Sequence, residues 1–299
     1  MSEIMQSPNR VDIAGVLVST DLKKGSFVKD GQTKDTIGGQ IIVRVEQEIN
    51  GKKIVSDIPI HMFSTKYTRN GTINPSYESI ETIMNDFVSL AAAGNPEQAD
   101  KVTLNGEIRM NEYTGRDGKL VSFPRIHASF ASRAKGEITP KAEFDVTFAV
   151  LQKAEETSKD GKETGRYIVK AAVMQYGGRA DVVPFIVEAE NAINFISAYW
   201  DDGATVRATG KLNFTSRKET TVTEVDFGEP QKRERTISIS DLVITGGSNP
   251  IEGAGAYTEE QIKEALAARM AIIEKNKNKA TSTPTAPPKT TFDSSNLGF

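Results

Sequence analysis

The sequence predicts a mainly β protein in which one unit of five strands and a helix occurs twice in tandem. Three observations support this prediction. Segments of alternating apolar and polar residues, typical of strands, recur along most of the chain. Both halves keep the order β-β-β-α-β-β. A proline occupies the third strand of each half (Pro59 and Pro184), and a glycine occupies the fourth (Gly106 and Gly210).

The first half contains all six elements in order. Its five expected strands are 11–18, 39–47, 54–63, 102–113 and 123–132. A basic loop is expected at 23–38, and Asn50-Gly51 is a hairpin signal between the second and third strands. A helix is expected from Tyr77 to Leu90, because apolar residues recur there at helical spacing after Pro75-Ser76. A turn at 115–118 joins the last two strands.

The second half repeats this order from Phe144. Its expected strands begin or lie at 144–147, 165–170, 181–185, 206–212 and 236–244, with a helix at 191–200. Proline removes a donor from the strand ladder, and a glycine inside a strand marks a sharp bend, as closing a small barrel requires. A helix between the third and fourth strands is the plug of an OB-fold. We therefore expect two tandem five-stranded OB-fold Greek-key barrels; two unrelated β-sandwich domains are the alternative.

The composition excludes several kinds of protein. The 299 residues include no cysteine and two histidines, which excludes disulfides, thiolate metal sites and a histidine-rich metal centre. We find no catalytic constellation, and we expect no enzyme activity, no metal and no cofactor. No apolar run is long enough to span a bilayer and no secretory signal is evident, so we expect a cytoplasmic protein. The net charge of −3 argues mildly against a nucleic-acid partner.

Several motifs resemble a known family. The opening segment Asn9–Leu17 resembles the first strand of bacterial and phage single-stranded DNA-binding proteins. Val102–Ile108, Tyr113, Asp117-Gly118 and Ile126–Ala128 resemble that family's last two strands and the turn between them. In the second half the matching segments are Val183–Phe185, Trp200 and Gly210–Leu212.

The resemblance covers roughly residues 9–247. It implies a protein that coats and protects single-stranded DNA in replication or recombination, with little sequence preference, in the host cytoplasm if a phage encodes it. A monomer and a homodimer both remain open. The second hypothesis is a structural or protein-docking module built on OB-folds without nucleic-acid binding. A continuous positive groove would favour DNA, and scattered charge would favour docking.

OB-folds bind single strands on the outer face of strands two and three and with the loops that join strands one–two and four–five. Lysine and arginine neutralise phosphates, and aromatic rings stack on bases. The predicted DNA-binding residues of the first half are Lys23, Lys24, Phe27, Arg44, His61, Phe63, Arg109, Tyr113, Arg116, Lys119, Phe123 and Arg125. Those of the second half are Arg166, Lys170, Tyr176, Arg179, Arg207, Lys211, Arg217, Lys218, Arg233 and Arg235.

Each of these cations could equally be an ordinary solvated side chain. Tyr167 is expected in the core, because it shares the phase of Val169. Trp200 is expected to plug the second barrel rather than stack on a base. His61 and His127 are expected to be polar residues on the barrel surface rather than metal ligands.

The predicted divisions of the chain are a first OB-fold at 1–138, a second at 139–250, a C-terminal helix at 251–276 and a disordered tail at 277–299. Thr258–Gln261 fits a capping box at the start of the helix. Its apolar stripe is Ile262, Leu266, Met270 and Ile273. The tail ends with Phe292, Leu297 and Phe299. This apolar tip is either a ligand for a replication or recombination protein or a segment without a role.

Overall fold

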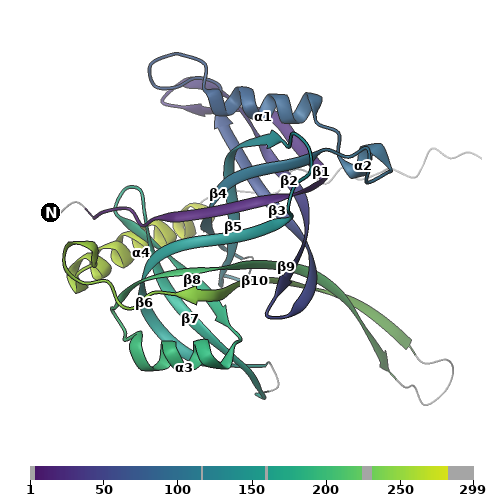
Figure 1. Cartoon of the computed structure of the whole chain (residues 1–299). Helices are drawn as coiled ribbons and strands as arrows, with labels where there is room; N and C mark the ends of the chain where they lie inside the picture. The colour runs from purple at the N-terminus through teal and green to yellow at the C-terminus, as the bar shows by residue number, and fades with distance from the viewer. Residues whose placement is uncertain (1–3, 116, 159–160, 224–230, 282–299) are drawn as a thin grey trace, which may run out of the picture.

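The computed structural model describes residues 4–115, 117–158, 161–223 and 231–281. The protein is mainly β, with ten strands and a C-terminal helix, as the sequence predicts (Figure 1). The first half contains β1 (Asn9–Lys29), β2 (Gln32–Ile49), β3 (Lys52–Thr65), α1 (Pro75–Asp86), α2 (Leu90–Ala93), β4 (Lys101–Thr114) and β5 (Leu120–Arg133). The second contains β6 (Lys141–Thr157), β7 (Glu163–Gln175), β8 (Arg179–Val187), α3 (Glu190–Tyr199), β9 (Thr205–Thr223) and β10 (Gln231–Gly247). A 3-10 turn, η1 (Gly253–Gly255), precedes α4 (Glu259–Thr281).

Each half closes its strands into a ring. The strand order is β2-β3-β5-β4-β1-β6-β7-β8-β10-β9, and the additional pairings β1–β2 and β6–β9 close the two sets of five. We call β1–β5 the first barrel and β6–β10 the second barrel. Asn9–Ala14 of β1 also pairs with Lys141–Val146 of β6, so the two barrels share one sheet.

The prolines lie where a strand has a single partner. Pro59 pairs only with β2, immediately before the short parallel pairing of β3 with β5 at Ile60 and His61. Pro184 pairs only with β7, two residues before the one bridge between β8 and β10 at Ile186. Because proline has no backbone N–H to donate to a second neighbour, both positions accommodate it without loss of a hydrogen bond.

The glycines of the fourth strands lie where two backbones approach closely. A Cβ at Gly106 would be 2.6 Å from the carbonyl oxygen of His127, and the register of β4 with β5 shifts at this point. A Cβ at Gly210 would overlap the carbonyl oxygen of Val243 and the ring of Phe144. Only glycine fits at these positions without displacing a neighbouring strand.

The core of the second barrel contains a cluster of aromatic rings. Phe148 stacks on Phe185, with ring centroids 5.0 Å apart, and meets Trp200 edge-on at 5.8 Å. Trp200 is fully buried at the end of α3 and donates its Nε1 hydrogen to the carbonyl oxygen of Ser248 at 2.9 Å. The predicted plug is therefore confirmed. Tyr167 packs against this core, as predicted, but it is only partly buried, and its hydroxyl donates to Glu155.

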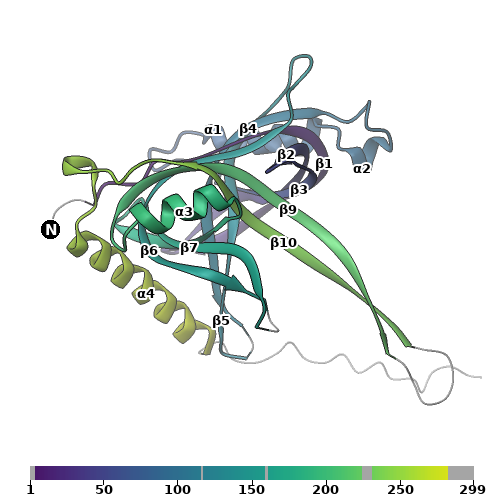
Figure 2. The ribbon, with the colours of Figure 1, turned by 60° about the horizontal axis from the view of Figure 1, so that its bottom comes forward.

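Two expected loops are strand hairpins. β1 and β2 pair as far as Lys29 and Gln32, so the basic loop predicted at 23–38 is wrong. Asp30 and Gly31 form the tip, both with positive φ. β9 and β10 pair out to Thr223 and Gln231 and form an arm that extends away from the barrels (Figures 1 and 2). Backbone pairing stabilises these hairpins although few apolar side chains mark them.

Two helices differ from their predicted bounds. α1 ends at Asp86 because Phe87 has extended backbone, and the short α2 follows where the predicted helix would have continued. α4 continues to Thr281, so residues 277–281 are helical and not part of a disordered tail. Its Met270 is 47% exposed, which corrects the predicted stripe, and Arg269 occupies the packed face instead. Residues 282–299 lie outside the described residues.

Contacts between the barrels fix their relative position. Gln47 at the end of β2 donates to the carbonyl oxygen of Leu212 at 2.8 Å and accepts from the backbone of Ala142 at 3.2 Å. The backbone N–H of Met110 on β4 donates to Asp181 on β8 at 3.1 Å. α4 lies against β7, β8 and β4 and thus covers both barrels (Figure 2). No helix within the described ranges is long and apolar enough to cross a bilayer.

Candidate nucleic-acid interface

The outer face of β3, β5 and β4 brings aromatic and basic side chains together. The parallel pairing of β3 with β5 sets His61 beside His127, with stacked rings whose centroids are 5.7 Å apart. Further along β5, the Arg125 guanidinium lies 5.2 Å from the centroid of the Phe123 ring. Phe123 in turn meets Tyr113 of β4 edge-on at 6.4 Å. These side chains form one band across three strands, which we call the aromatic band.

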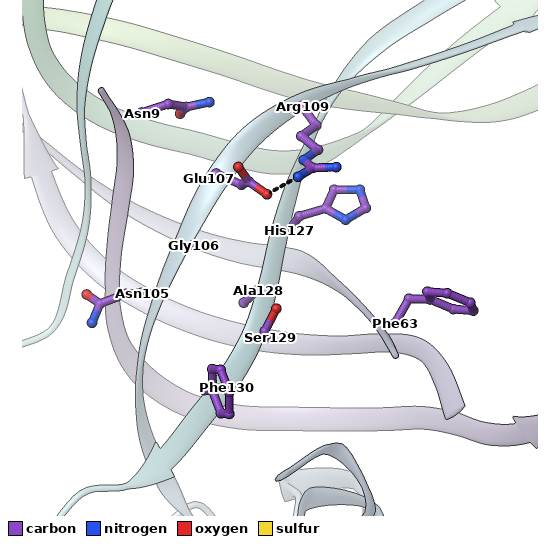
Figure 3. Close-up of a pocket in the computed structure, with 10 residues that line it drawn as sticks. All are labelled: Asn9, Phe63, Asn105, Gly106, Glu107, Arg109, His127, Ala128, Ser129 and Phe130. Atoms are coloured by element: carbon purple, nitrogen blue, oxygen red, sulfur yellow. Dashed lines mark ion pairs between the residues drawn. The ribbon is translucent and has the colours of Figure 1, made fainter. Parts of the chain in front are cut away.

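A groove of about 650 Å³ adjoins this band. Beyond their short pairing β3 and β5 no longer bond to each other, and Phe63 of β3 and Phe130 of β5 line the groove at well-separated points (Figure 3). These two rings are 59% and 52% exposed. His127 and Arg109 lie at the opposite end, where Arg109 pairs with Glu107 at 2.5 Å (Figure 3). We call this space the first groove.

Phe130 is a candidate that sequence analysis missed. Simple alternation gives it the phase of Ile126 and Ala128, which are buried. However, Asn105 pairs with Phe130 whereas Glu107 pairs with His127, so β5 contains one residue more than β4 at this point. Such a bulge reverses the side-chain phase, and Phe130 points outward. The sequence signal that could have revealed this bulge is Gly106, the glycine in the middle of β4.

The two histidines are uncharged at neutral pH. Burial first, and then the nearby Arg109, His61 and Arg125, together lower the pKa of His127 to about 4. Burial, followed by Arg125, also lowers the pKa of His61. The band therefore presents two neutral heteroaromatic rings beside two arginines, a combination that suits base stacking next to phosphate neutralisation.

Several predicted DNA-binding cations already have partners. Arg44 donates two hydrogen bonds of 2.7 Å to Asp57, and Arg207 is bidentate to Asp145. The remaining partners are Asp21 for Lys23, Glu81 for Lys24, Gln152 for Lys170 and the Glu48 carbonyl oxygen for Lys211.

Arg166 is the most fully satisfied of these cations. Its guanidinium donates two bonds of 2.7 Å to Glu156, one of 2.8 Å to Asp241 and one of 3.5 Å to Glu188. The hydrogen bonds to Glu156 are the largest cause of the raised pKa of Arg166, and they lower the pKa of Glu156. Arg166 thus joins β7 to β6, β8 and β10.

Three predicted cations have neither an ion pair nor a side-chain hydrogen bond among the described residues: Arg125, Lys119 near the tip of the β4–β5 hairpin, and Arg179 at the start of β8. Phe27 on the β1–β2 hairpin is 42% exposed, and Tyr176 in the β7–β8 turn is 87% exposed. In the first barrel, the two predicted cations without a partner therefore lie on the aromatic band (Arg125) or on the hairpin that carries part of it (Lys119).

Other predicted contacts lie outside the described residues or side chains. Arg116 and the tail residues Phe292, Leu297 and Phe299 lie outside the described residues. Arg217 and Lys218 belong to β9, and Arg233 and Arg235 belong to β10, but their side chains are not described. Within the described ranges, no group of three or more His, Asp and Glu side chains could hold a metal ion.

The chain belongs to the YorF family, whose model matches residues 7–279. Its fold resembles that of a deletion variant of the single-stranded DNA-binding protein from Thermus aquaticus, at a TM-score of 0.50 and 11% identity, over 85% of this chain and 98% of that one. The wild-type protein from the same organism matches at a TM-score of 0.49 and 10% identity, over 86% and 99% of the two chains. Among curated proteins, none matches the chain.

Proposed function

We propose that this protein binds single-stranded DNA without sequence preference and has no enzymatic activity. The observation that carries the proposal is the aromatic band beside the first groove. Stacking on an aromatic ring is worth about 1–3 kcal/mol per base and tolerates any base, because every base has a π-face. On one surface, the neutral pair His61–His127 and the exposed Phe63 provide rings for base stacking, and the unpaired Arg125 provides a charge for phosphate neutralisation.

The proposal includes the domain organisation. We infer that the first and second barrels are tandem OB-folds, each with its helix (α1 or α3) between the third and fourth strands. The likeness in fold to a single-stranded DNA-binding protein supports this assignment. In the second barrel, Tyr176, Arg179 and the arginines and lysine of the β9–β10 arm are the proposed contacts. Coating of single strands in phage or bacterial replication or recombination is the role that such binding would serve.

The proposal divides the predicted cations into two groups. Arg44, Arg166 and Arg207 donate to carboxylates of their own barrel, so we assign them to the stability of the fold. Arg125, Lys119 and Arg179, which have no ion pair among the described residues, are assigned to phosphates, whereas Arg109 already pairs with Glu107.

A titration of fluorescein-labelled oligo-dT, followed by anisotropy, tests the proposal. We expect binding at about 50 mM NaCl that weakens steeply toward about 200 mM, with a logarithmic slope near 0.7 for each phosphate contact. Duplex DNA of the same length should bind more weakly. Phe63→Ala should lower the affinity about 5- to 150-fold, as expected for the loss of one stacked base. Tyr199→Ala, at a ring on α3 that is 56% exposed, is the matched control.

Absence of oligo-dT binding at about 50 mM NaCl would refute the proposal, because electrostatic binding is strongest at low salt. It would leave the docking module as the remaining hypothesis.

A further inference from the structure

Phe130 forms the common wall of two grooves. It lines the first groove together with Phe63, and it also lines a second groove of about 370 Å³ between β1, β4, β5 and the start of β6. Asn105, which pairs with Phe130 across the bulge, lines both grooves as well. The phenyl ring is therefore a partition between two adjacent spaces on one surface.

The second groove has the chemistry of a backbone-binding site. Thr103 and Ser132 contribute hydroxyl groups, and Lys141 contributes an ammonium group. The carboxylate in the same lining, Asp12, is paired with Arg10 at 2.8 Å. Lys141 is exposed and has no ion pair among the described residues. It is the first residue of β6 and pairs with Ala14 of β1, so it marks the junction between the barrels.

An exposed phenyl ring between two grooves requires an explanation. The side chain of Phe130 is 52% exposed, and no other aromatic ring stacks on it within the described part of the chain. The bulge at Gly106 turns it outward; in regular pairing it would face the core beside Ala128. A bulge that exposes a large apolar group indicates a binding surface more than a packing need.

We infer that Phe130 is a base-stacking partition over which a bound single strand passes from the first groove into the second. One base stacks on the ring from the first groove, the strand crosses the bulge, and Lys141 neutralises a phosphate at the barrel junction. The inference rests on the proposed function and adds to it the direction in which the strand leaves the first barrel.

The native tryptophan content makes a direct test possible. The chain has one tryptophan, Trp200, and it is fully buried. In Phe130→Trp, titration with unlabelled oligo-dT should quench the emission of the indole introduced on the partition by at least about half, because stacking on a base quenches indole fluorescence. Tyr199→Trp places an indole at a ring of similar exposure on α3 and should show no quenching.

Affinity provides the second readout. Phe130→Ala should bind labelled oligo-dT about 5- to 150-fold more weakly, and Phe130→Tyr should bind as the wild type does. Lys141→Gln should lower the logarithmic salt slope by about 0.7, whereas Lys263→Gln on the exposed side of α4 should leave it unchanged. Because these side chains are exposed, all four variants should keep the unfolding temperature of the wild type within a few degrees.

The outcomes separate the two proposals. If wild-type protein binds oligo-dT but the indole at position 130 is not quenched and Phe130→Ala binds normally, the partition is overturned and the proposed function remains. If the wild type does not bind at low salt, both are overturned. Quenching at position 130 with an unchanged salt slope in Lys141→Gln would overturn the path into the second groove.

Discussion

Arg125 and Arg166 were both predicted as phosphate contacts, and replacing each with glutamine should give opposite phenotypes. The Arg125 guanidinium lies over the Phe123 ring and has no ion pair among the described residues. Arg166 donates to Glu156, Asp241 and Glu188. A guanidinium held by carboxylates gains little from a phosphate, whereas an open one releases a counterion when the phosphate is neutralised.

The magnitudes follow from this difference. For single strands each phosphate contact contributes about 0.7 to the slope of log affinity against log salt. When NaCl is raised from about 50 to about 200 mM, the fold-loss of affinity of Arg125→Gln should therefore be smaller than that of the wild type by a factor of about 2.6. Arg166→Gln should keep the wild-type slope. It should instead lower the free energy of unfolding by about 1–3 kcal/mol, less than for a fully buried pair because these side chains are 17–28% exposed.

Anisotropy titrations at four salt concentrations and urea unfolding of both variants measure the two quantities independently. A reduced salt slope in Arg166→Gln, equal to that in Arg125→Gln, would refute the reasoning. So would an unchanged slope in Arg125→Gln together with normal folding.

Three further predictions concern the fold that supports the surface. The pKa of His127 is about 4 in the folded protein, below its ordinary value, so the stability contributed by the neutral ring is complete above about pH 6.5 and is lost as the pH falls toward 4. In urea unfolding over this pH range, the free energy of unfolding of the wild type should fall by about 1–3 kcal/mol more than that of His127→Gln, after allowance for the partial exposure of the ring. Arg269→Met should lower the free energy of unfolding by about 2–4 kcal/mol and the thermal midpoint by about 3–6 °C, because it leaves the Glu112 carboxylate without its ion pair at 12% exposure. Adding Glu112→Leu should restore most of this loss in calorimetry, and no recovery would contradict the role given to the Arg269–Glu112 pair. Gly210→Ala should destabilise the protein by about 3 kcal/mol or more, because the added Cβ would overlap the Val243 carbonyl oxygen and the Phe144 ring. Gly25→Ala, whose Cβ would be 3.4 Å from its nearest neighbour, should change the unfolding midpoint little. Equal effects of the two variants in thermal unfolding would contradict the close approach of backbones as the reason for Gly210.

Local pattern was sufficient to predict the order of elements. Alternation of side chains is a property of the strand itself, so Ile41, Val43 and Val45 could be assigned to the core without knowledge of their partners, and all three are fully buried. The prolines and glycines at matching positions of the two halves predicted that each set of strands closes into a ring. Proline is tolerated where a strand has one hydrogen-bonded neighbour, and glycine is required where two backbones come into contact.

Features that depend on a second strand were not predictable in this way. The long β1–β2 and β9–β10 hairpins are stabilised by ladders between mostly polar residues, which resemble loops in sequence. Phe130 faces outward only because β4 and β5 differ by one residue at the bulge. Arg166 and Arg125 are both outward arginines of a strand, and only the positions of carboxylates on other strands separate their roles.

The connection between the barrels bears on how a single strand would be held. Gln47, Asp181 and α4 all contact across the junction, and β1 pairs directly with β6. The barrels are therefore not joined by a flexible linker alone. A bound DNA strand that leaves the first barrel near Lys141 would meet the surface of the second barrel in a position that these contacts already fix. Binding by the second barrel then requires little additional ordering of the protein, so the loss of conformational freedom falls mainly on the nucleic acid. On this argument the shared sheet, more than the number of basic residues, is what would allow two modest binding surfaces to act as one.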